Sequence, residues 1–166
     1  NILRDIKINL IGKIQLKNIL MSIIAAEKSG LDIKKILSVV PKIKSVDGRF
    51  EKIGKLKNKS IVILDYAHTP DALKTCLLNL KEQFPNKKIS LVFGCGGNRD
   101  RDKRYKMGKI AFQYSDEIYL TDDNPRFENP VKIRNDIKKG IKLKNIKEIS
   151  NRAKAIKLAI ENLNSG

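Results

Sequence analysis

A short group of polar residues, Asp123-Asn-Pro-Arg126, has the types and spacing to bind an amino acid. A carboxylate can pair with an ammonium group, while an amide and a guanidinium fork can hold a carboxylate. Pro125 restricts the backbone between them, as a rigid site requires. The alternative is an ordinary turn, because Asp, Asn and Pro also favour turns.

A glycine loop, Gly94-Cys-Gly-Gly97, precedes three arginines. Glycines let a backbone approach a ligand and present N–H groups to an anion, but they equally form tight turns. Arg99 stands where a dinucleotide-binding loop would have glycine or alanine, so that fingerprint is not matched. Three side chains could hold carboxylates or phosphates, or lie as charges on a helix surface: Arg99, Arg101 and Arg104.

A third polar segment, residues 65–71, contains Asp65 and the single histidine, His68. Asp65 could accept hydrogen bonds from ribose hydroxyls, hold a cation or form a local turn. His68 is a candidate site residue, although a lone histidine before a helix is more often structural. One histidine with two distant cysteines, Cys76 and Cys95, provides no metal-binding pattern, so we expect no metal site in this chain.

Three apolar runs, residues 61–64, 89–93 and 117–121, predict strands that are buried on both faces. Each run ends where one of the polar segments begins. In an open parallel sheet, ligands bind outside the carboxyl ends of the strands. The three polar segments should therefore line one edge of one sheet.

Helical and strand patterns alternate after Gly54, which predicts an α/β fold with a mostly parallel sheet covered by helices on both faces. An alternating pattern over residues 5–11 predicts an earlier strand, and residues 44–58 look like a boundary between two parts. Thr69-Pro70-Asp71 should begin a helix with a cap residue, a proline and an acid. The other expected elements are helices at 16–29, 32–40, 103–114, from about 130, and 152–163, and a short strand at 147–150.

The chain carries a formal net charge of +17. Its cations are spread through every segment, which indicates a solvated lysine surface and no nucleic-acid binding. No apolar run reaches the roughly 18 residues of a membrane span, so membrane insertion is not expected. Two cysteines form no disulfide framework, and a cytoplasmic location is expected. No pattern indicates an oligomeric state.

Four segments, in this order and spacing, resemble the Mur ligase family: Gly48-Arg-Phe-Glu51, Asp65-Tyr-Ala-His-Thr-Pro-Asp71, Gly94-Cys-Gly-Gly-Asn-Arg-Asp100 and Asp123-Asn-Pro-Arg126. The likeness covers almost the whole chain and is greatest for the branch that adds meso-diaminopimelate. Three residues depart from the family pattern: Gln15, Asn98 and Tyr105.

The resemblance implies a three-domain, ATP-dependent ligase. Residues 1–45 would end its central ATP-binding domain, and residues 46–166 would be its C-terminal domain, truncated at the end. In such enzymes ATP converts a substrate carboxylate into an acyl phosphate, which the amine of the incoming amino acid attacks. The implied partners are a UDP-linked muramoyl dipeptide and meso-diaminopimelate, and the implied cofactors are ATP and Mg²⁺.

The same resemblance implies roles for individual residues. The nucleotide would be held by Asn18, Arg49 and, at the ribose, Asp65. The amino-acid site would comprise Arg99, Asp123, Asn124, Pro125 and Arg126. No Gly-x-x-Gly-Lys-Thr phosphate loop occurs in the sequence, and the family's Gly-Lys-Gly-His-Glu segment would lie beyond Gly166. We therefore expect no catalytic residue and no Mg²⁺ ligand in this stretch, which should be inactive alone.

Two alternatives stay open at this point. The first is another Mur or folylpolyglutamate-type ligase that adds lysine or glutamate. Arg126 argues against lysine, because lysine has no distal carboxylate for a guanidinium to hold. The second is a free-standing nucleotide-binding module.

Overall fold

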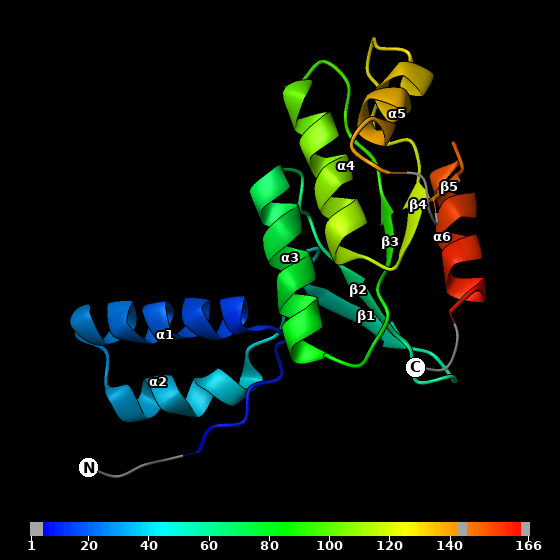
Figure 1. The fold of residues 1–166 in the computed structure, drawn as a ribbon. Helices are drawn as coiled ribbons and strands as arrows, with labels where there is room; N and C mark the ends of the chain where they lie inside the picture. The colour runs from blue at the N-terminus through cyan, green and yellow to red at the C-terminus, as the bar shows by residue number, and fades with distance from the viewer. Residues whose placement is uncertain (1–4, 143–145, 164–166) are drawn as a thin grey trace. The chain divides into compact units, whose positions relative to one another are not determined.

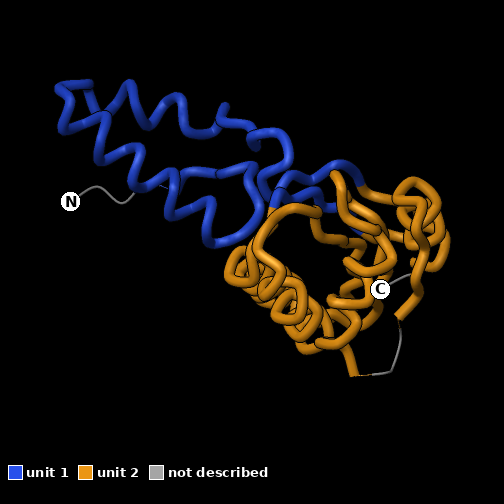
Figure 2. Tube along the Cα trace, turned by 90° about the horizontal axis from the view of Figure 1, so that it is seen from above, with its two compact units in different colours: residues 1–54, 61–66 blue, residues 55–60, 67–166 orange. Residues whose placement is uncertain are grey.

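The structure is a computed structural model that describes residues 5–142 and 146–163. Two compact units divide the chain: unit 1 comprises residues 1–54 and 61–66, and unit 2 comprises residues 55–60 and 67–166 (Figure 2). Across the described residues, no helix has both the length and the apolar character that a membrane span needs.

Unit 1 begins with two helices, α1 (Lys13–Lys28) and α2 (Ile33–Val39), and a 3-10 turn at Val40–Lys42 (Figure 1). Both helices lie where the apolar spacing predicts them. The strand predicted over residues 5–11 is wrong, since these residues form no strand in the structure. A strand needs a hydrogen-bonded neighbour, and the strands described in unit 1 pair with each other.

Those strands are β1 (Glu51–Lys55) and β2 (Ile61–Leu64), which form a two-stranded sheet. Their connection is too short for the crossover that parallel pairing requires, so they run antiparallel. The sequence predicts β2 but not β1, which lies in the stretch expected to be a boundary. The expectation that β2 belongs to one sheet with the later strands is wrong, because β2 pairs with β1 instead.

Unit 2 contains a three-stranded sheet with the order β3 (Ser90–Phe93), β4 (Glu117–Leu120) and β5 (Ile146–Glu148). Both pairings are parallel, with Ile118 of β4 opposite Leu91 of β3 and Ile146 of β5. Four helices accompany these strands: α3 (Pro70–Gln83), α4 (Asp102–Tyr114), α5 (Pro130–Lys138) and α6 (Arg152–Glu161).

Side-chain caps begin three of these helices. The hydroxyl of Thr69 accepts the backbone N–H of Ala72 at 3.2 Å, and Pro70 occupies the first turn of α3, as the sequence predicts. The side chains of Asn129 and Asn151 cap α5 and α6 in the same way. These caps fix where each helix starts, and so fix the lengths of the loops that leave the strands.

Opposite faces of β4 pack on different helices. Ile118 and Leu120 are buried in a core with side chains of α3, α4 and α5, whereas the hydroxyl of Tyr119 accepts a hydrogen bond from Nδ2 of Asn162 at the end of α6. Helix α6 also contacts β3 and β4. Helices α3 and α4 therefore lie on one side of the strands and α6 on the other (Figure 1), which confirms the predicted fold class.

Helices α4 and α5 approach each other at two glycines. A Cβ atom at Gly108 would lie 2.1 Å from the carbonyl oxygen of Ile137, and one at Gly140 would lie 2.1 Å from the carbonyl oxygen of Tyr105. Both distances are far shorter than a van der Waals contact. The atom approached is in each case a backbone oxygen, which cannot move without its chain. A larger residue at either position would force the helices apart.

We predict that Gly108→Ala destabilises the protein by about 1–3 kcal/mol, because the added methyl group overpacks the α4–α5 contact. An alanine in an open helix position would instead be stabilising. The control is Gly54→Ala, where a Cβ atom meets nothing within 4 Å, and its effect should stay below about 0.5 kcal/mol. Urea unfolding followed by circular dichroism measures the free energy of unfolding of both variants. Equal stabilities of Gly108→Ala and Gly54→Ala would refute the close approach of the two helices.

Candidate functional site

The loops that follow β3 and β4 lie against each other in unit 2. Because the two strands are parallel neighbours, their carboxyl ends reach the same edge of the sheet. The backbone N–H of Gly97 donates to the carbonyl oxygen of Asn124 at 2.8 Å, and Nη1 of Arg126 donates to the carbonyl oxygen of Gly97 at 2.7 Å. The predicted meeting of the glycine loop with residues 123–126 is therefore confirmed.

Glycines in the first loop make this contact possible. A Cβ atom would lie 2.3 Å from the carbonyl oxygen of Thr121 if placed on Gly94, and 1.9 Å from that of Pro125 if placed on Gly97. On Gly96 it would lie 2.9 Å from Nη1 of Arg126. The glycines thus make room for the second loop and for the arginine that it carries.

Two amides at the end of the glycine loop donate to groups of the protein itself. The N–H of Gly97 donates to Asn124, and the N–H of Asn98 donates to Oε1 of Glu128 at 2.5 Å. Both amides therefore bind the neighbouring loop and not a ligand. The loop acts as a tight, protein-bound turn at these residues.

Residues 123–126 form a turn that keeps its polar side chains at the surface. Oδ1 of Asn124 accepts the backbone N–H of Arg126 at 3.1 Å, and Arg126 has a positive φ of 50°. Asp123, Asn124 and Arg126 are exposed, as is Arg99 in the facing loop. A guanidinium has five N–H donors, so the bond to Gly97 fixes the Arg126 fork without using all of it.

Arg104 does not reach the surface, although the sequence suggests it as a ligand-binding arginine. It is 0% exposed, and Nη1 and Nη2 lie 3.0 and 2.8 Å from the two carboxylate oxygens of Glu128. Nη1 also lies 3.2 Å from Oδ2 of Asp136. The expectation is wrong for this residue, because its carboxylate partners belong to the protein itself.

A signal in the sequence could have identified this buried pair. Arg104 precedes Met107, Gly108 and Ala111 at helical spacing, and all four are buried on α4. A charged residue on the apolar face of a helix needs an internal partner. Glu128 was missed as that partner, because nothing local relates it to a helix 24 residues earlier.

The ion pair changes the acidity of Glu128. Hydrogen bonds from the Arg104 guanidinium, and then from the N–H of Asn98, lower the pKa of its carboxyl group from 4.5 to about 2. Arg101 adds a longer contact, 3.5 Å from Nε to Oε2. Glu128 is therefore fully ionised at neutral pH, and its carboxylate can accept hydrogen bonds from the Arg104 guanidinium and the Asn98 N–H together.

Unit 1 connects the three residues that the family resemblance assigns to the nucleotide. Nδ2 of Asn18 donates to the side chain of Gln15 at 3.4 Å, and Nε2 of Gln15 donates to the carbonyl oxygen of Arg49 at 2.9 Å. The next backbone N–H, that of Phe50, donates to Oδ2 of Asp65 at 2.8 Å. Asn18, Arg49 and Asp65 are thus joined through one short chain of hydrogen bonds.

An aromatic ring orients the second of these residues. The guanidinium carbon of Arg49 lies 4.5 Å from the centroid of the Tyr66 ring, a cation–π distance. Phe50 is buried and packs against Gly12, where a Cβ atom would lie 3.0 Å from the Phe50 ring. The segment from Arg49 to Phe50 is therefore held from both sides within unit 1.

His68 is exposed, and the structure gives its backbone a role. The carbonyl oxygen of His68 accepts a hydrogen bond from Nζ of Lys103 at 3.0 Å. This contact does not use the imidazole ring, so a role for the ring stays a prediction. In the part of the chain that the structure describes, no three His, Cys, Asp or Glu side chains gather as metal ligands.

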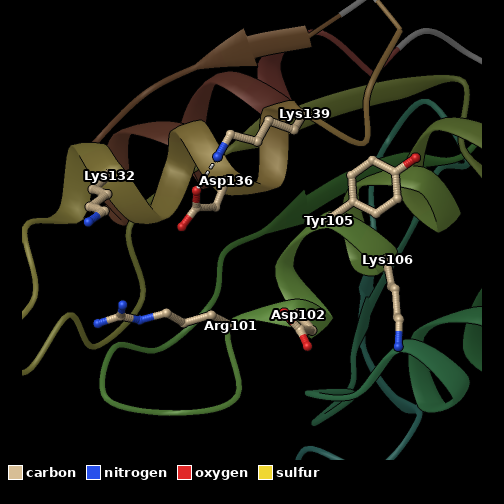
Figure 3. A pocket seen from close by; sticks show the side chains of 7 residues that line it. All are labelled: Arg101, Asp102, Tyr105, Lys106, Lys132, Asp136 and Lys139. Carbon is tan, nitrogen blue, oxygen red and sulfur yellow. Dashed lines mark hydrogen bonds and ion pairs between the residues drawn. The ribbon is translucent and has the colours of Figure 1, made fainter.

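A shallow hollow of about 540 Å³ lies between α4 and α5 (Figure 3). None of residues 123–126 lines it, and one of its lysines, Lys139, is paired with Asp136 at 2.8 Å. The candidate amino-acid site is therefore the pair of loops and not this hollow. The hollow is lined by Arg101, Asp102, Tyr105, Lys106, Lys132, Asp136 and Lys139.

Comparisons with known proteins agree with this arrangement. A family model described as "Mur ligase, glutamate ligase domain" matches residues 48–166. A UDP-N-acetylmuramoyl-L-alanyl-D-glutamate–2,6-diaminopimelate ligase of Rickettsia felis is 42% identical over 156 residues, 93% of this chain and 29% of that protein. The ligase of the same name from Buchnera aphidicola is 46% identical over 154 residues, 92% of this chain and 30% of that protein. The chain thus spans about a third of the length of these relatives.

Solved structures show the same fold. One ligase of that name matches with a TM-score of 0.69 and 38% identity, covering 97% of this chain and 33% of the other. A folylpolyglutamate synthase of Thermotoga maritima matches with a TM-score of 0.73 and 27% identity, covering 95% of this chain and 36% of the other. The fold is therefore shared by ligases with different amino-acid substrates.

We predict that Arg104→Met destabilises the protein by about 3 kcal/mol, because Glu128 and Asp136 would lose the buried cation that they share. Arg101→Met is the matched control, since Arg101 also reaches Glu128 but its side chain is 64% exposed. An exposed ion pair contributes less than about 1 kcal/mol. Thermal unfolding compares the two variants, and equal losses would contradict the role of the buried pair.

The Glu128 carboxyl group should contribute to acid unfolding. Because its folded pKa is lowered, its contribution is complete above the ordinary value of 4.5 and is lost as the pH falls toward about 2. The wild-type protein should therefore lose more stability than Glu128→Gln between about pH 5 and pH 2. Urea midpoints at several pH values measure this. Glu161→Gln, which removes an exposed carboxylate, should keep the wild-type profile, and a Glu128→Gln profile identical to wild type would refute the prediction.

Proposed function

The chain belongs to the Mur ligase family, and on that premise we propose that it is the C-terminal part of an ATP-dependent ligase that adds meso-diaminopimelate to a UDP-linked muramoyl dipeptide. The observation that carries this proposal is the rigid turn at residues 123–126, whose guanidinium is held against the glycine loop. The similarity to diaminopimelate ligases over nearly the whole chain supports it. The proposed location is the cytoplasm, whose reducing conditions suit Cys76 and Cys95, two cysteines that form no disulfide.

The amino-acid site of the proposal lies on the two loops of unit 2. Meso-diaminopimelate carries a carboxylate and an ammonium group at each end. The Arg126 fork suits the distal carboxylate, because a guanidinium can form two parallel hydrogen bonds to it. Asn124 and Arg99 supply further donors, while Asp123 supplies an anion for an ammonium group and Pro125 stiffens the turn.

The nucleotide site of the proposal draws on unit 1. Asn18, Arg49 and Asp65 would contact ATP, with Asp65 at the ribose, and their hydrogen-bonded connection supports a common role. Bound ATP supplies the phosphoryl group that activates the substrate carboxylate. The proposal assigns no Mg²⁺ ligand to residues of this chain.

The proposed reaction joins these partners in two steps. Transfer of the γ-phosphoryl group to the glutamate side-chain carboxylate gives an acyl phosphate and ADP. The diaminopimelate amine then attacks the acyl carbon, phosphate leaves, and an amide bond forms. In this proposal the chain holds the amino acid in place and contributes no catalytic residue, because it has no phosphate loop.

The domain assignment is also part of the proposal. Residues 1–45 would end the central ATP-binding domain and residues 46–166 would belong to the C-terminal domain. The family match from residue 48 supports this boundary. The two compact units divide the chain slightly later, since unit 1 continues to Gly54 and includes residues 61–66.

A second candidate is a ligase of the same fold that adds glutamate, as the likeness to a folylpolyglutamate synthase suggests. Glutamate also has two carboxylates, so Arg126 alone does not exclude it. The higher identity to the diaminopimelate ligases favours our proposal. Comparing the amino acids that the full-length enzyme accepts decides between the two.

We predict that Arg126→Ala in the full-length ligase weakens the use of meso-diaminopimelate at least about tenfold, since losing a hydrogen bond to a charged group costs roughly 1.5–3 kcal/mol. Arg126→Lys should restore little, because an ammonium group keeps the charge but not the fork. The KM for ATP should stay nearly unchanged. Steady-state kinetics with meso-diaminopimelate, lysine and glutamate measure these effects.

The control is Arg152→Ala, which removes an exposed arginine on α6 and should behave as wild type. Normal diaminopimelate use by Arg126→Ala would exclude the assigned role of Arg126. A wild-type preference for lysine or glutamate would show that the substrate assignment is wrong within the right family.

A further inference from the structure

Glu128 links three segments of unit 2 through one carboxylate. Its two oxygens accept hydrogen bonds from Arg104 of α4, and Oε1 also accepts the backbone N–H of Asn98 in the glycine loop. Glu128 itself belongs to the segment that follows Arg126. The carboxylate therefore connects the buried side of α4 to both candidate substrate loops.

Hydrogen bonds run between the two loops in both directions at this point. While the N–H of Asn98 donates to Glu128, Oδ1 of Asn98 accepts the N–H of Phe127 at 3.1 Å. Next to this pair, the N–H of Gly97 donates to Asn124. The Glu128 bond is the one among these that uses an ionised acceptor, and such bonds are about twice as strong as neutral ones.

Two backbone conformations near Glu128 need support from their surroundings. Asn98 and Arg126 have φ angles of 48° and 50°, in the left-handed region that most residues other than glycine disfavour, Arg more strongly than Asn. Such conformations persist where nearby contacts hold them in place. Glu128 bonds directly to Asn98 and lies two residues after Arg126, so it restrains both.

The path from Glu128 to the Arg126 guanidinium is short. Glu128 fixes Asn98, the adjacent Gly97 provides the carbonyl oxygen that accepts Nη1 of Arg126, and the N–H of Glu128 itself bonds to the carbonyl oxygen of Pro125 at 2.9 Å. Both the base of the turn and the acceptor of the guanidinium thus depend on Glu128. A shift of either would move the fork relative to a bound carboxylate.

We propose that Glu128 is a positioning residue for substrate binding: held by the buried Arg104, its carboxylate sets the two loops so that Arg126 meets the distal carboxylate of the incoming amino acid. This inference rests on the proposed function. It concerns a residue that does not touch the substrate and acts through the arginine that does.

Asp136 provides a matched control within the same network. It shares Arg104 with Glu128, at 3.2 Å from Nη1, but its other partner is Lys139, directly after the end of its own helix. No described contact joins it to residues 94–100 or 121–127. Asp136→Asn therefore removes a carboxylate from Arg104 without releasing a substrate loop. Glu128→Gln instead weakens both the bonds to Arg104 and the bond to the Asn98 N–H.

The test measures KM for meso-diaminopimelate and for ATP in the full-length ligase. Glu128→Gln should raise the KM for meso-diaminopimelate at least about tenfold, since small misplacements of a binding group are costly, and should leave that for ATP within about twofold. Asp136→Asn should leave both within about twofold. Equal effects of the two variants on the diaminopimelate KM would overturn the proposal.

A double-mutant cycle separates positioning from general destabilisation. If Glu128 acts through Arg126, the effect of Glu128→Gln on the KM for meso-diaminopimelate should nearly disappear in an Arg126→Ala background. Additive effects of the two substitutions would overturn the proposal. The same cycle made with Asp136→Asn should show no coupling.

Hydrogen exchange tests the positioning without any substrate. In the full-length protein, the Gly97 and Asn98 amides should exchange at least about tenfold faster in Glu128→Gln than in wild type or in Asp136→Asn. Unchanged exchange would overturn the inference. If the wild type fails to ligate meso-diaminopimelate while Glu128→Gln still speeds this exchange, the proposed function is wrong and the role of Glu128 in loop position stands.

Discussion

The buried guanidinium of Arg104 determines the position of the loops of unit 2 that follow β3 and β4. Burying a charge costs free energy unless carboxylates and hydrogen bonds replace the lost water. Glu128 and Asp136 provide those carboxylates, and Glu128 does so from the loop after β4. The loop therefore cannot leave α4 without exposing or unpairing a charge. That constraint holds the surface turn at residues 123–126 in one position.

The position of these loops also depends on glycines, which have no side chain. Glycines at 94 and 97 remove the side chains that would collide with the carbonyl oxygens of Thr121 and Pro125, and Gly108 does the same between α4 and α5. Because α4 carries Arg104, the close packing of α4 on α5 also decides where that guanidinium lies. Helix packing, the ion pair and the loop contact thus form one connected arrangement.

The candidate binding residues divide between the two units. The three residues that resemble nucleotide ligands are joined within unit 1, where Gln15 connects Asn18 to Arg49. Gln15 departs from the usual family residue, and its side-chain amide makes both contacts. The residues that suit an amino acid lie in unit 2 on the parallel sheet. In the proposed enzyme, each unit would thus bring a different partner to the reaction.

The sequence alone determined the elements whose signals are local. Capped helix starts such as Thr69-Pro70 and the apolar runs of β3 and β4 are short-range patterns, and the structure confirms them. They also predicted that the glycine loop meets residues 123–126, because parallel strands end at one edge. The tertiary structure decided what depends on distant partners. It paired β2 with β1, left residues 5–11 without a strand partner, and buried Arg104 against Glu128, since pairing and burial are set by residues far apart in the chain.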